Sequence, residues 1–137
     1  VSTKQRGNPI LQHIRNVPYT FAKMVPDYIV HTQRCALFLS LKYHSLHPHY
    51  IHRRISELRT DFTLRVLLCL VDVDDNAHML LYLNKIAVQN NLSLILAWTP
   101  EEAARYLETL KALDGKDATT IQKKKFEKFA DQVVDVM

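Results

Sequence analysis

Glycine is nearly absent from this chain, with only 2 among 137 residues. Glycine-rich phosphate loops, including the fingerprint that binds dinucleotides, need several glycines in a short run after a strand. No such run occurs, which excludes a Rossmann-type site. Cysteine is equally rare, with 2 residues. Cys35 and Cys69 both lie in apolar runs, so buried thiols are favoured over a disulfide, and neither carries a nucleophile signature.

Long apolar runs are also missing. The longest, residues 66–71, is far too short to cross a bilayer. No secretory leader begins at Val1, so we expect a protein of the cytosol or nucleus without membrane contact. Because the chain starts without methionine and ends on a charged amphipathic segment, we also expect it to be a fragment of something longer.

The composition is that of one soluble domain: 47% of the residues are apolar and 23% are charged. The formal net charge of +4, with 7 histidines counted as neutral, is a mild basic bias. That bias is compatible with a nucleic-acid partner, and equally with a basic surface that meets only solvent.

The hydrophobic pattern predicts a single α/β domain, with a mixed, mostly parallel sheet flanked by helices on both faces. Predicted strands cover residues 10–14, 17–21, 26–30, 35–41, 64–71 and 92–98. One predicted helix follows Pro48, with Ile51, Ile55 and Leu58 inward and His52, Arg53, Arg54 and Arg59 outward. A second is capped by Asp74 or Asp75 and runs to Asn90, and a third begins at the Thr99 cap and stops at Gly115.

Both ends of the chain are predicted to lie outside this core. Residues 1–8 are predicted to be a flexible basic arm, and residues 118–137 an amphipathic C-terminal helix. That helix would carry Phe126, Phe129 and Val133 on one side, with Lys123 to Lys125 on its wet face.

Two clusters could hold metals. His44 with His47, and His49 with His52, have the spacing of helix-face ligands. Pro48 separates the pairs and no cysteine or carboxylate completes a zinc site, so histidines bordering a polar groove are the alternative. Asp72, Asp74 and Asp75 could hold Mg²⁺, or could simply cap a helix.

The run from Cys35 to Ile51 is the most informative about function. An uncharged strand ends in Lys42, Tyr43 and His44, and further histidines and a tyrosine follow. A buried strand that delivers cations and flat rings to its end favours a surface for phosphates, bases or a peptide.

Several motifs together carry a family resemblance: RGNP, PDYIV, ALFLSLKYH, LHP and ILAW. With the segments around them they resemble, in order and over nearly the whole chain, the central domain of a noncatalytic repair subunit. That small subunit belongs to the structure-specific endonuclease of nucleotide excision repair and pairs with the xeroderma pigmentosum group F nuclease. The family's C-terminal tandem helix-hairpin-helix domain is absent from this sequence. Because dimerisation in the family belongs mainly to that domain, we expect a monomer.

The resemblance implies a nuclease-like fold that has lost catalysis. The partner's Gly-Asp motif corresponds to Pro26-Asp27, and its Glu-Arg-Lys motif to Leu37-Phe38-Leu39. Divalent metals need carboxylate oxygens, which a Leu-Phe-Leu strand does not offer. The resemblance therefore implies no catalytic residue, no cofactor and no metal, and a vacated cleft that binds without cutting.

In the family this groove receives a peptide of the group A damage-verification scaffold and contacts single-stranded or junction DNA. Carried over by position, the groove residues are Lys4, Gln5, Arg6, Gly7, Asn8, Pro9, Phe38, Ser40, Lys42, Tyr43 and Tyr50. Basic residues that could contact DNA are His44, His47, His49, Arg53 and Arg54. Tyr43 and Tyr50 are expected to sandwich a ring, and Asn8 and Ser40 to bond a peptide backbone. An active metal-dependent endonuclease using Asp27, Asp72 and Asp74, and a ligand-free structural spacer, remain as alternatives.

Overall fold

A computed structural model describes residues 1–31, 33–58 and 62–112 of this chain. Four strands form one sheet in the order β1-β2-β3-β4. They span Tyr28–His31 (β1), Arg34–Ser40 (β2), Leu64–Leu70 (β3) and Ser93–Ala97 (β4). β2, β3 and β4 run parallel, while β1 pairs antiparallel with β2 at one edge. The predicted mixed, mostly parallel sheet is confirmed.

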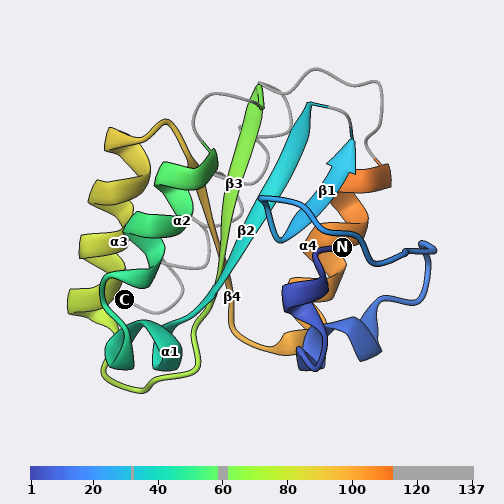
Figure 1. The fold of residues 1–137 in the computed structure, drawn as a ribbon. Coiled ribbons are helices and arrows are strands. Elements are labelled where there is room, and N and C mark those ends of the chain that lie inside the picture. The colour runs from blue at the N-terminus through green and yellow to red at the C-terminus, as the bar shows by residue number, and fades with distance from the viewer. Residues whose placement is uncertain (32, 59–61, 113–137) are drawn as a thin grey trace.

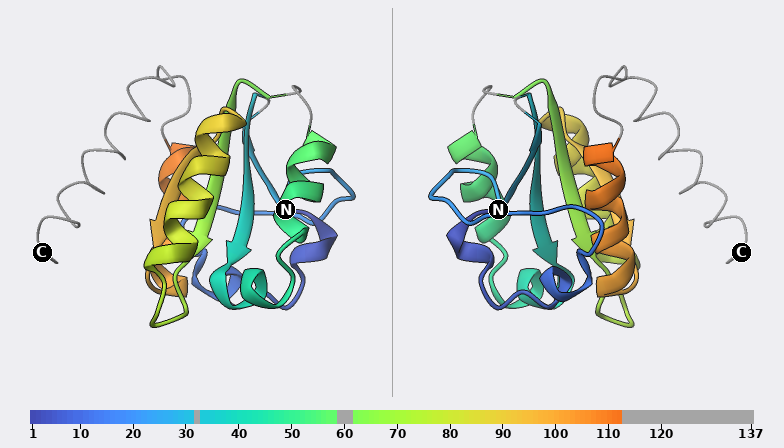
Figure 2. Two further views of the ribbon diagram at one scale, coloured as in Figure 1. Left: turned by 90° about the vertical axis from the view of Figure 1, so that its left-hand side faces the viewer. Right: turned by 90° about the vertical axis from the view of Figure 1, so that its right-hand side faces the viewer.

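Helices cover both faces of the sheet, as predicted (Figures 1 and 2). α1 (Leu41–Leu46), α2 (Tyr50–Leu58) and α3 (Ala77–Gln89) lie on one face. α4 (Pro100–Ala112) and the N-terminal segment, with its 3₁₀ helices η1 (Thr3–Gln5) and η2 (Pro9–His13), cover the other. No helix within the described residues is long and apolar enough to span a bilayer.

Alternation along the strands builds a core on each face. Leu37, Leu39 and Leu67 join Ile51, Ile55 and Leu58 of α2 on one side. Ala36, Val66 and Leu68 join Ile10 and Leu11 of η2 and Leu107 and Leu110 of α4 on the other. Because β2 and β3 are buried on both faces, they read as nearly continuous apolar runs. Cys35 and Cys69 are buried free thiols in one of these cores, as predicted, and burial raises the pKa of each to about 12.

The N-terminal third differs most from the predictions. Residues 10–14 form most of η2 rather than a strand, and residues 17–21 form no strand. Asn8 caps η2 by accepting from the Ile10 N–H at 3.1 Å, with Pro9 at the first helical position. Because Ile10 and Leu11 are both buried, the inward face does not alternate as a strand would require.

Residues 1–8, expected to be a loose arm, make specific hydrogen bonds. The Ser2 N–H donates to the Asp27 carbonyl at 2.8 Å, and the Thr3 N–H to the Ala22 carbonyl at 3.1 Å. Ser2 and Gln5 are buried. The arm is therefore attached along the sheet edge.

Two helix starts also differ from the predictions. α3 begins after Asn76, and neither Asp74 nor Asp75 caps it. α1 was not predicted; it is capped by Ser40 at the end of β2. The Thr99 cap of α4 is confirmed, since its Oγ1 accepts from the Glu102 N–H at 3.1 Å. The predicted stop at Gly115 and the helix over 118–137 lie outside the described residues.

Candidate functional site

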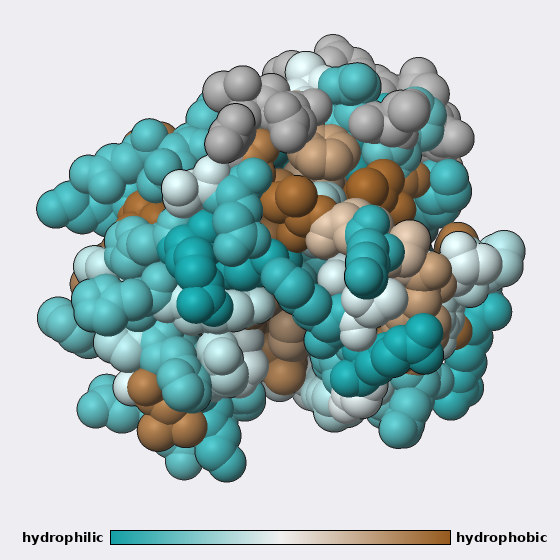
Figure 3. Space-filling view, viewed as in Figure 1, coloured by the Kyte–Doolittle hydropathy of each residue, from teal (hydrophilic) through white to brown (hydrophobic). Residues whose placement is uncertain are grey.

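The site forms where β2 ends, between the N-terminal arm on one side and α1 and α2 on the other (Figure 1). In the space-filling view the surface is hollowed between these two parts, with apolar atoms showing in the hollow (Figure 3). Crossovers between parallel strands leave such a crevice at the carboxyl ends of a sheet.

A buried ion pair lies at the base of this region. The Asp27 side chain is 1% exposed and the Arg54 side chain 2% exposed. Arg54 Nη2 donates to Asp27 Oδ1 at 2.9 Å and to the Val25 carbonyl at 2.7 Å. The other carboxylate oxygen of Asp27 accepts from the Phe38 N–H at 2.7 Å. Asp27 is thus held by β2 and by α2 together.

The charges of this pair are set by burial and by each other. Burial raises the pKa of Asp27 above its ordinary value, although the Phe38 N–H and the Arg54 guanidinium oppose that rise. Burial would lower the pKa of Arg54, but the Asp27 charge and its neighbours outweigh it and raise that pKa. Arg54 therefore stays a cation beside the Asp27 carboxylate.

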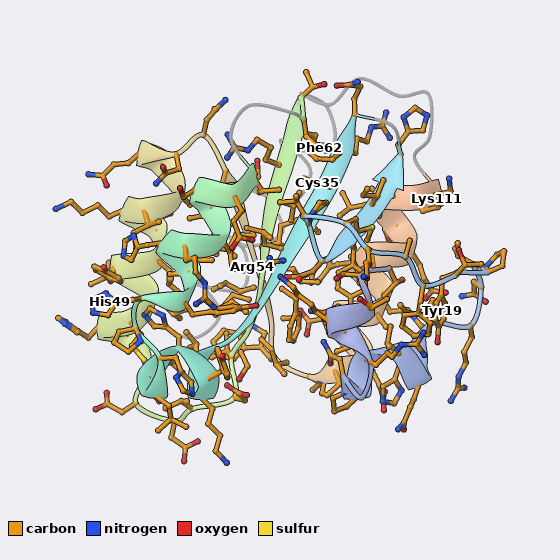
Figure 4. The ribbon with its side chains drawn as sticks, in the orientation of Figure 1. Tyr19, Cys35, His49, Arg54, Phe62 and Lys111 are labelled. Atoms are coloured by element: carbon orange, nitrogen blue, oxygen red, sulfur yellow. The ribbon has the colours of Figure 1, made fainter. Side chains whose placement is uncertain are left out.

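The prediction that Arg54 faces solvent is wrong, and in this conformation its buried guanidinium offers no surface for the predicted DNA contact. Figure 4 shows Arg54 between α2 and β2 rather than on the outer face of the helix. Its position was readable from the sequence. Arg54 is three residues after Ile51 and four before Leu58, so it borders the inward stripe of α2. What the sequence did not show is the partner, because Asp27 lies 27 residues away.

The aromatic residues of α1 and α2 gather beside this pair. The Tyr43 and Tyr50 ring centroids are 4.9 Å apart with an edge-to-face angle of 78°, and His47 lies against Tyr43 at 4.5 Å. At this separation no ring fits between Tyr43 and Tyr50, so the predicted sandwich is wrong for this conformation. A partner ring can only stack on their outer faces. Tyr43 is 42% exposed and available for that contact.

His44 is also not placed as predicted. It is only 5% exposed, so its ring offers almost no surface to a ligand. Its ring stacks on Tyr82 of α3 at 5.9 Å, while Tyr82 OH lies 2.7 Å from His52 Nε2. Burial and, to a lesser degree, His52 lower the pKa of His44. His44 thus anchors α1 to α3, whereas His47, His49 and Arg53 are exposed.

Ser40 and Lys42 both bond to Asp72, which follows the end of β3. Asp72 Oδ2 accepts from Ser40 Oγ at 2.5 Å, and Asp72 Oδ1 accepts from the Lys42 N–H at 2.9 Å. Ser40 Oγ also accepts from the Tyr43 N–H at 3.2 Å. The hydroxyl proton of Ser40 is therefore committed, and only a lone pair remains for a ligand. Asp72 supports α1 here, and no group of three metal-ligating side chains occurs among the described residues.

The arm presents its polar residues in a fixed pattern. Gln5 Oε1 accepts from Asn8 Nδ2 at 2.8 Å and from the Tyr28 hydroxyl at 3.0 Å. Between Gln5 and Asn8, Gly7 takes a φ of +87°, a conformation that favours glycine. The Arg6 guanidinium lies 4.3 Å from the centre of the Phe21 ring. Lys4, Arg6, Gly7 and Pro9 are exposed, and Asn8 and Phe38 are half-buried.

The structure thus brings the arm, the end of β2 and the aromatic helix turn to one region. Three of the predicted site residues, Gln5, His44 and Arg54, are instead buried in the interior. Sequence reasoning missed the supporting roles of Tyr28 and of Glu108, which binds the backbone after η2. Tyr28 lies in the PDYIV motif, but nothing in that motif shows its contact with Gln5, and Glu108 lies in none of the quoted motifs. Each residue acts on a segment distant in the sequence.

This geometry defines an α/β domain with a buried Asp27–Arg54 pair at the end of its parallel strands. The fold agrees with two solved structures, XPF from Aeropyrum pernix alone and in a complex with DNA. Their TM-scores are 0.67 and 0.62, at 15% and 16% identity, and each covers 87% of this chain. The matched parts are 62% and 67% of those chains. At such identities the likeness shows the fold alone.

The sequence gives the family directly. Residues 1–117 match the family described as "Binding domain of DNA repair protein Ercc1 (rad10/Swi10)". The chain is 48% identical over 133 residues to the mating-type switching protein swi10 of Schizosaccharomyces pombe, covering 97% of this chain and 53% of that protein. It is 49% identical over 122 residues to the DNA excision repair protein ERCC-1 of Arabidopsis thaliana, covering 89% and 30%. RAD10 of Saccharomyces cerevisiae is 33% identical over 116 residues, covering 80% and 54%.

This chain therefore belongs to the Ercc1/Rad10/Swi10 family of DNA repair proteins, as the sequence motifs predicted. It spans about half, or less, of the length of these curated relatives.

Proposed function

We propose that this domain is a noncatalytic docking module of the excision-repair endonuclease. It binds a peptide of the group A damage-verification scaffold, and single-stranded or junction DNA, between the arm and α1–α2. In this proposal a helix-hairpin-helix domain outside the chain pairs the subunit with the catalytic group F nuclease, and the complex works in the nucleus. The family's description as a binding domain of a DNA repair protein supports this assignment.

The Asp27–Arg54 pair is the observation that carries the proposal. A divalent metal would need Asp27 and at least one more carboxylate, together with open positions for water and substrate. Both Asp27 oxygens already accept hydrogen bonds, one from a guanidinium and one from a backbone amide. Phe38 and its neighbours in β2 supply no oxygen ligand. A buried arginine there satisfies the acidic group that the ancestral chemistry used, and the surface above it can bind without cutting.

The exposed chemistry above this pair suits a short peptide with an aromatic residue. Tyr43 offers an exposed ring face, and one Asn8 Nδ2–H is not used by Gln5. Lys4, Arg6 and Lys42 are exposed cations around the same region. A glycine-rich peptide can approach the backbone of the arm closely, because Gly7 has no side-chain atoms there.

The first experiment measures binding of a labelled scaffold peptide by fluorescence anisotropy. We expect Tyr43→Ala with Tyr50→Ala to lower the affinity by at least about tenfold, since ring stacking contributes about 1–3 kcal/mol. The matched control, Tyr43→Phe with Tyr50→Phe, keeps both rings and should retain most of the affinity. Unchanged affinity in the alanine variant would refute the groove assignment. If the wild type binds no peptide, the peptide-docking proposal fails and the ligand-free structural spacer is favoured.

A second experiment separates docking from catalysis. The chain is incubated with branched DNA and Mg²⁺ or Mn²⁺, and the products are resolved on a denaturing gel. We expect no cleavage above a metal-free control. Metal-dependent cleavage that is lost in Asp27→Asn would show an active endonuclease and overturn the proposal.

A further inference from the structure

The arm that borders the docking region is held from behind by α4. Glu108 Oε2 accepts from the Asn16 N–H at 2.6 Å and from the Arg15 N–H at 3.3 Å. Arg105 donates to the His13 carbonyl, and its Nε lies 2.6 Å from Glu108 Oε1. The contacts of α4 with His13, Arg15 and Asn16 join residues more than 90 positions apart. We propose that Arg105 and Glu108 are positioning residues that set where the arm presents Gly7 and Asn8, an inference that rests on the function proposed above.

The burial of Glu108 shows that this contact is specific. Its side chain is 8% exposed, whereas that of Arg105 is 50% exposed. A buried carboxylate is costly unless charged or hydrogen-bonding groups surround it. Here the arginine guanidinium and two backbone amides of the segment after η2 surround it. Glu108 therefore holds the chain where it leaves η2.

The contact reaches the arm through η2. Ile10 and Leu11 of η2 pack with Leu107 and Leu110 of α4 in one core. Asn8 is the N-cap residue of η2, and its Oδ1 accepts from the Ile10 N–H at 3.1 Å. Moving the end of η2 therefore moves Asn8 as well, because η2 is a short 3₁₀ helix of five residues with Asn8 as its N-cap.

The other end of the arm is fixed separately. Ser2 and Thr3 bond to the Asp27 and Ala22 carbonyls, and Gln5 accepts from the Tyr28 hydroxyl. Residues 4–9 are therefore attached at one end to the sheet edge and at the other, through η2, to α4. A recognition segment fixed at both ends loses little conformational freedom when a ligand binds, which favours affinity. Releasing the α4 end should weaken binding without removing any side chain that touches the ligand.

The test compares Glu108→Ala with Glu108→Gln in the 137-residue chain. Glutamine keeps an oxygen that can accept from the Asn16 N–H, while alanine removes the acceptor. In ligand-free protein, two-dimensional NMR follows the backbone amides of Gly7 and Asn8 and the Asn8 side-chain amide. Hydrogen exchange follows the amides of Arg15 and Asn16. Scaffold-peptide affinity is then measured well below the unfolding temperature, and Glu101→Ala, on the exposed first turn of α4, is the control.

We expect Glu108→Ala to speed exchange at Arg15 and Asn16, to shift the Gly7 and Asn8 signals, and to weaken peptide binding about three- to tenfold. Glu108→Gln should restore most of each effect, and Glu101→Ala should change none. Signals of Tyr43 should stay in place. Should Glu108→Ala fail to fold, Arg105→Ala gives the same readouts from a half-exposed position.

Faster exchange at Arg15 and Asn16 with unmoved Gly7 and Asn8 signals would overturn the inference. The Glu108 contact would then hold only the segment after η2 and would not position the arm. Equal affinity in Glu108→Ala and wild type would also overturn it. If the wild type binds no peptide, the proposed function fails. The Gly7 and Asn8 signals then still decide whether α4 positions the arm.

Discussion

At the scale of the residue, the most deeply buried charges of the site are those of the Asp27–Arg54 pair. A buried pair of this kind is a weak source of net stability, but removing one partner leaves an uncompensated charge. The two residues come from β1's leading turn and from α2, so the same contact also fixes the helix against the sheet edge.

We expect Asp27→Ala, which leaves the Arg54 guanidinium buried without its carboxylate, to lower the free energy of unfolding by about 3–5 kcal/mol. Urea denaturation followed by circular dichroism measures the loss. The control is Arg53→Ala, the exposed neighbour on α2, which should change stability by no more than about 0.5 kcal/mol. Similar losses in the two variants would contradict a structural role for the pair.

His44 makes stability depend on pH in the opposite sense from a salt-bridged histidine. Its pKa is lowered in the folded protein by burial and by His52. The unfolded chain therefore binds a proton at this residue at higher pH than the folded chain does. Stability contributed by neutral His44 is complete above the unfolded pKa of about 6.5 and declines as the pH falls through that value.

The measurement is urea unfolding at a series of pH values from neutral to mildly acidic. We expect the loss of stability below about pH 6.5 to be smaller in His44→Phe, which keeps a ring against Tyr82 but cannot take up a proton. His49→Phe, at an exposed position, is the control and should retain the wild-type slope. A slope that His44→Phe leaves unchanged would assign the effect to another histidine.

At the scale of the element, the sequence predicted best the strands and helices that contribute most to the buried core. β2, β3 and β4 are nearly continuous apolar runs, and α4 begins at a Thr-Pro-Glu-Glu start whose Thr99 cap is present. α1 was missed because it has only six residues and its cap, Ser40, is also the last residue of β2. The support from Asp72, 32 positions from Ser40, cannot be read from local sequence. The error at η2 was different in kind. Asn8 and Pro9 form a recognisable helix start. The apparent apolar–polar alternation from Ile10 to Ile14 nevertheless favoured a strand in the sequence-based prediction.

The turn between η1 and η2 gives a prediction at this scale. Gly7 has a φ of +87°, and a Cβ there would meet nothing within 4 Å. The whole cost of Gly7→Ala is therefore backbone strain, about 1–2 kcal/mol in the free energy of unfolding. Gly7→Asn should cost less, because asparagine tolerates this region better. Thermal unfolding of the two variants checks the order, and an alanine variant as stable as wild type would mean that the turn relaxes without strain.

At the scale of the whole molecule, the site is assembled from segments that are distant in the sequence. Arm residues 4–9, Asp27, the end of β2, Arg54 and Glu108 all contribute. Motif resemblance located the arm and the aromatic turn, because those residues stand in recognisable order. It did not separate residues that face the ligand from those that support them. Exposure and partners decide that separation, and both depend on tertiary contacts that no local pattern contains.

The exposed cations near the groove are the basis of the last prediction. Lys4, Arg6, Lys42 and Arg53 are all exposed, whereas Arg54 is buried and paired. For single-stranded DNA, each phosphate contact contributes about −0.7 to the slope of log affinity against log salt. If three or four of these cations meet phosphates, the slope is about −2 to −3, so binding is weak and falls steeply as salt rises.

Lys42→Ala should lower the affinity for an oligonucleotide and make the slope shallower by about 0.7, because one phosphate contact is lost. Lys42→Arg keeps the charge and should keep the slope. Lys85→Ala removes a lysine from the exposed surface of α3 and is the matched control for net charge. Anisotropy titrations at several salt concentrations give all four slopes. Equal slopes for Lys42→Ala and Lys85→Ala would mean that DNA is attracted by net charge alone, whereas a slope lost only at Lys42 places the strand beside the Tyr43 ring.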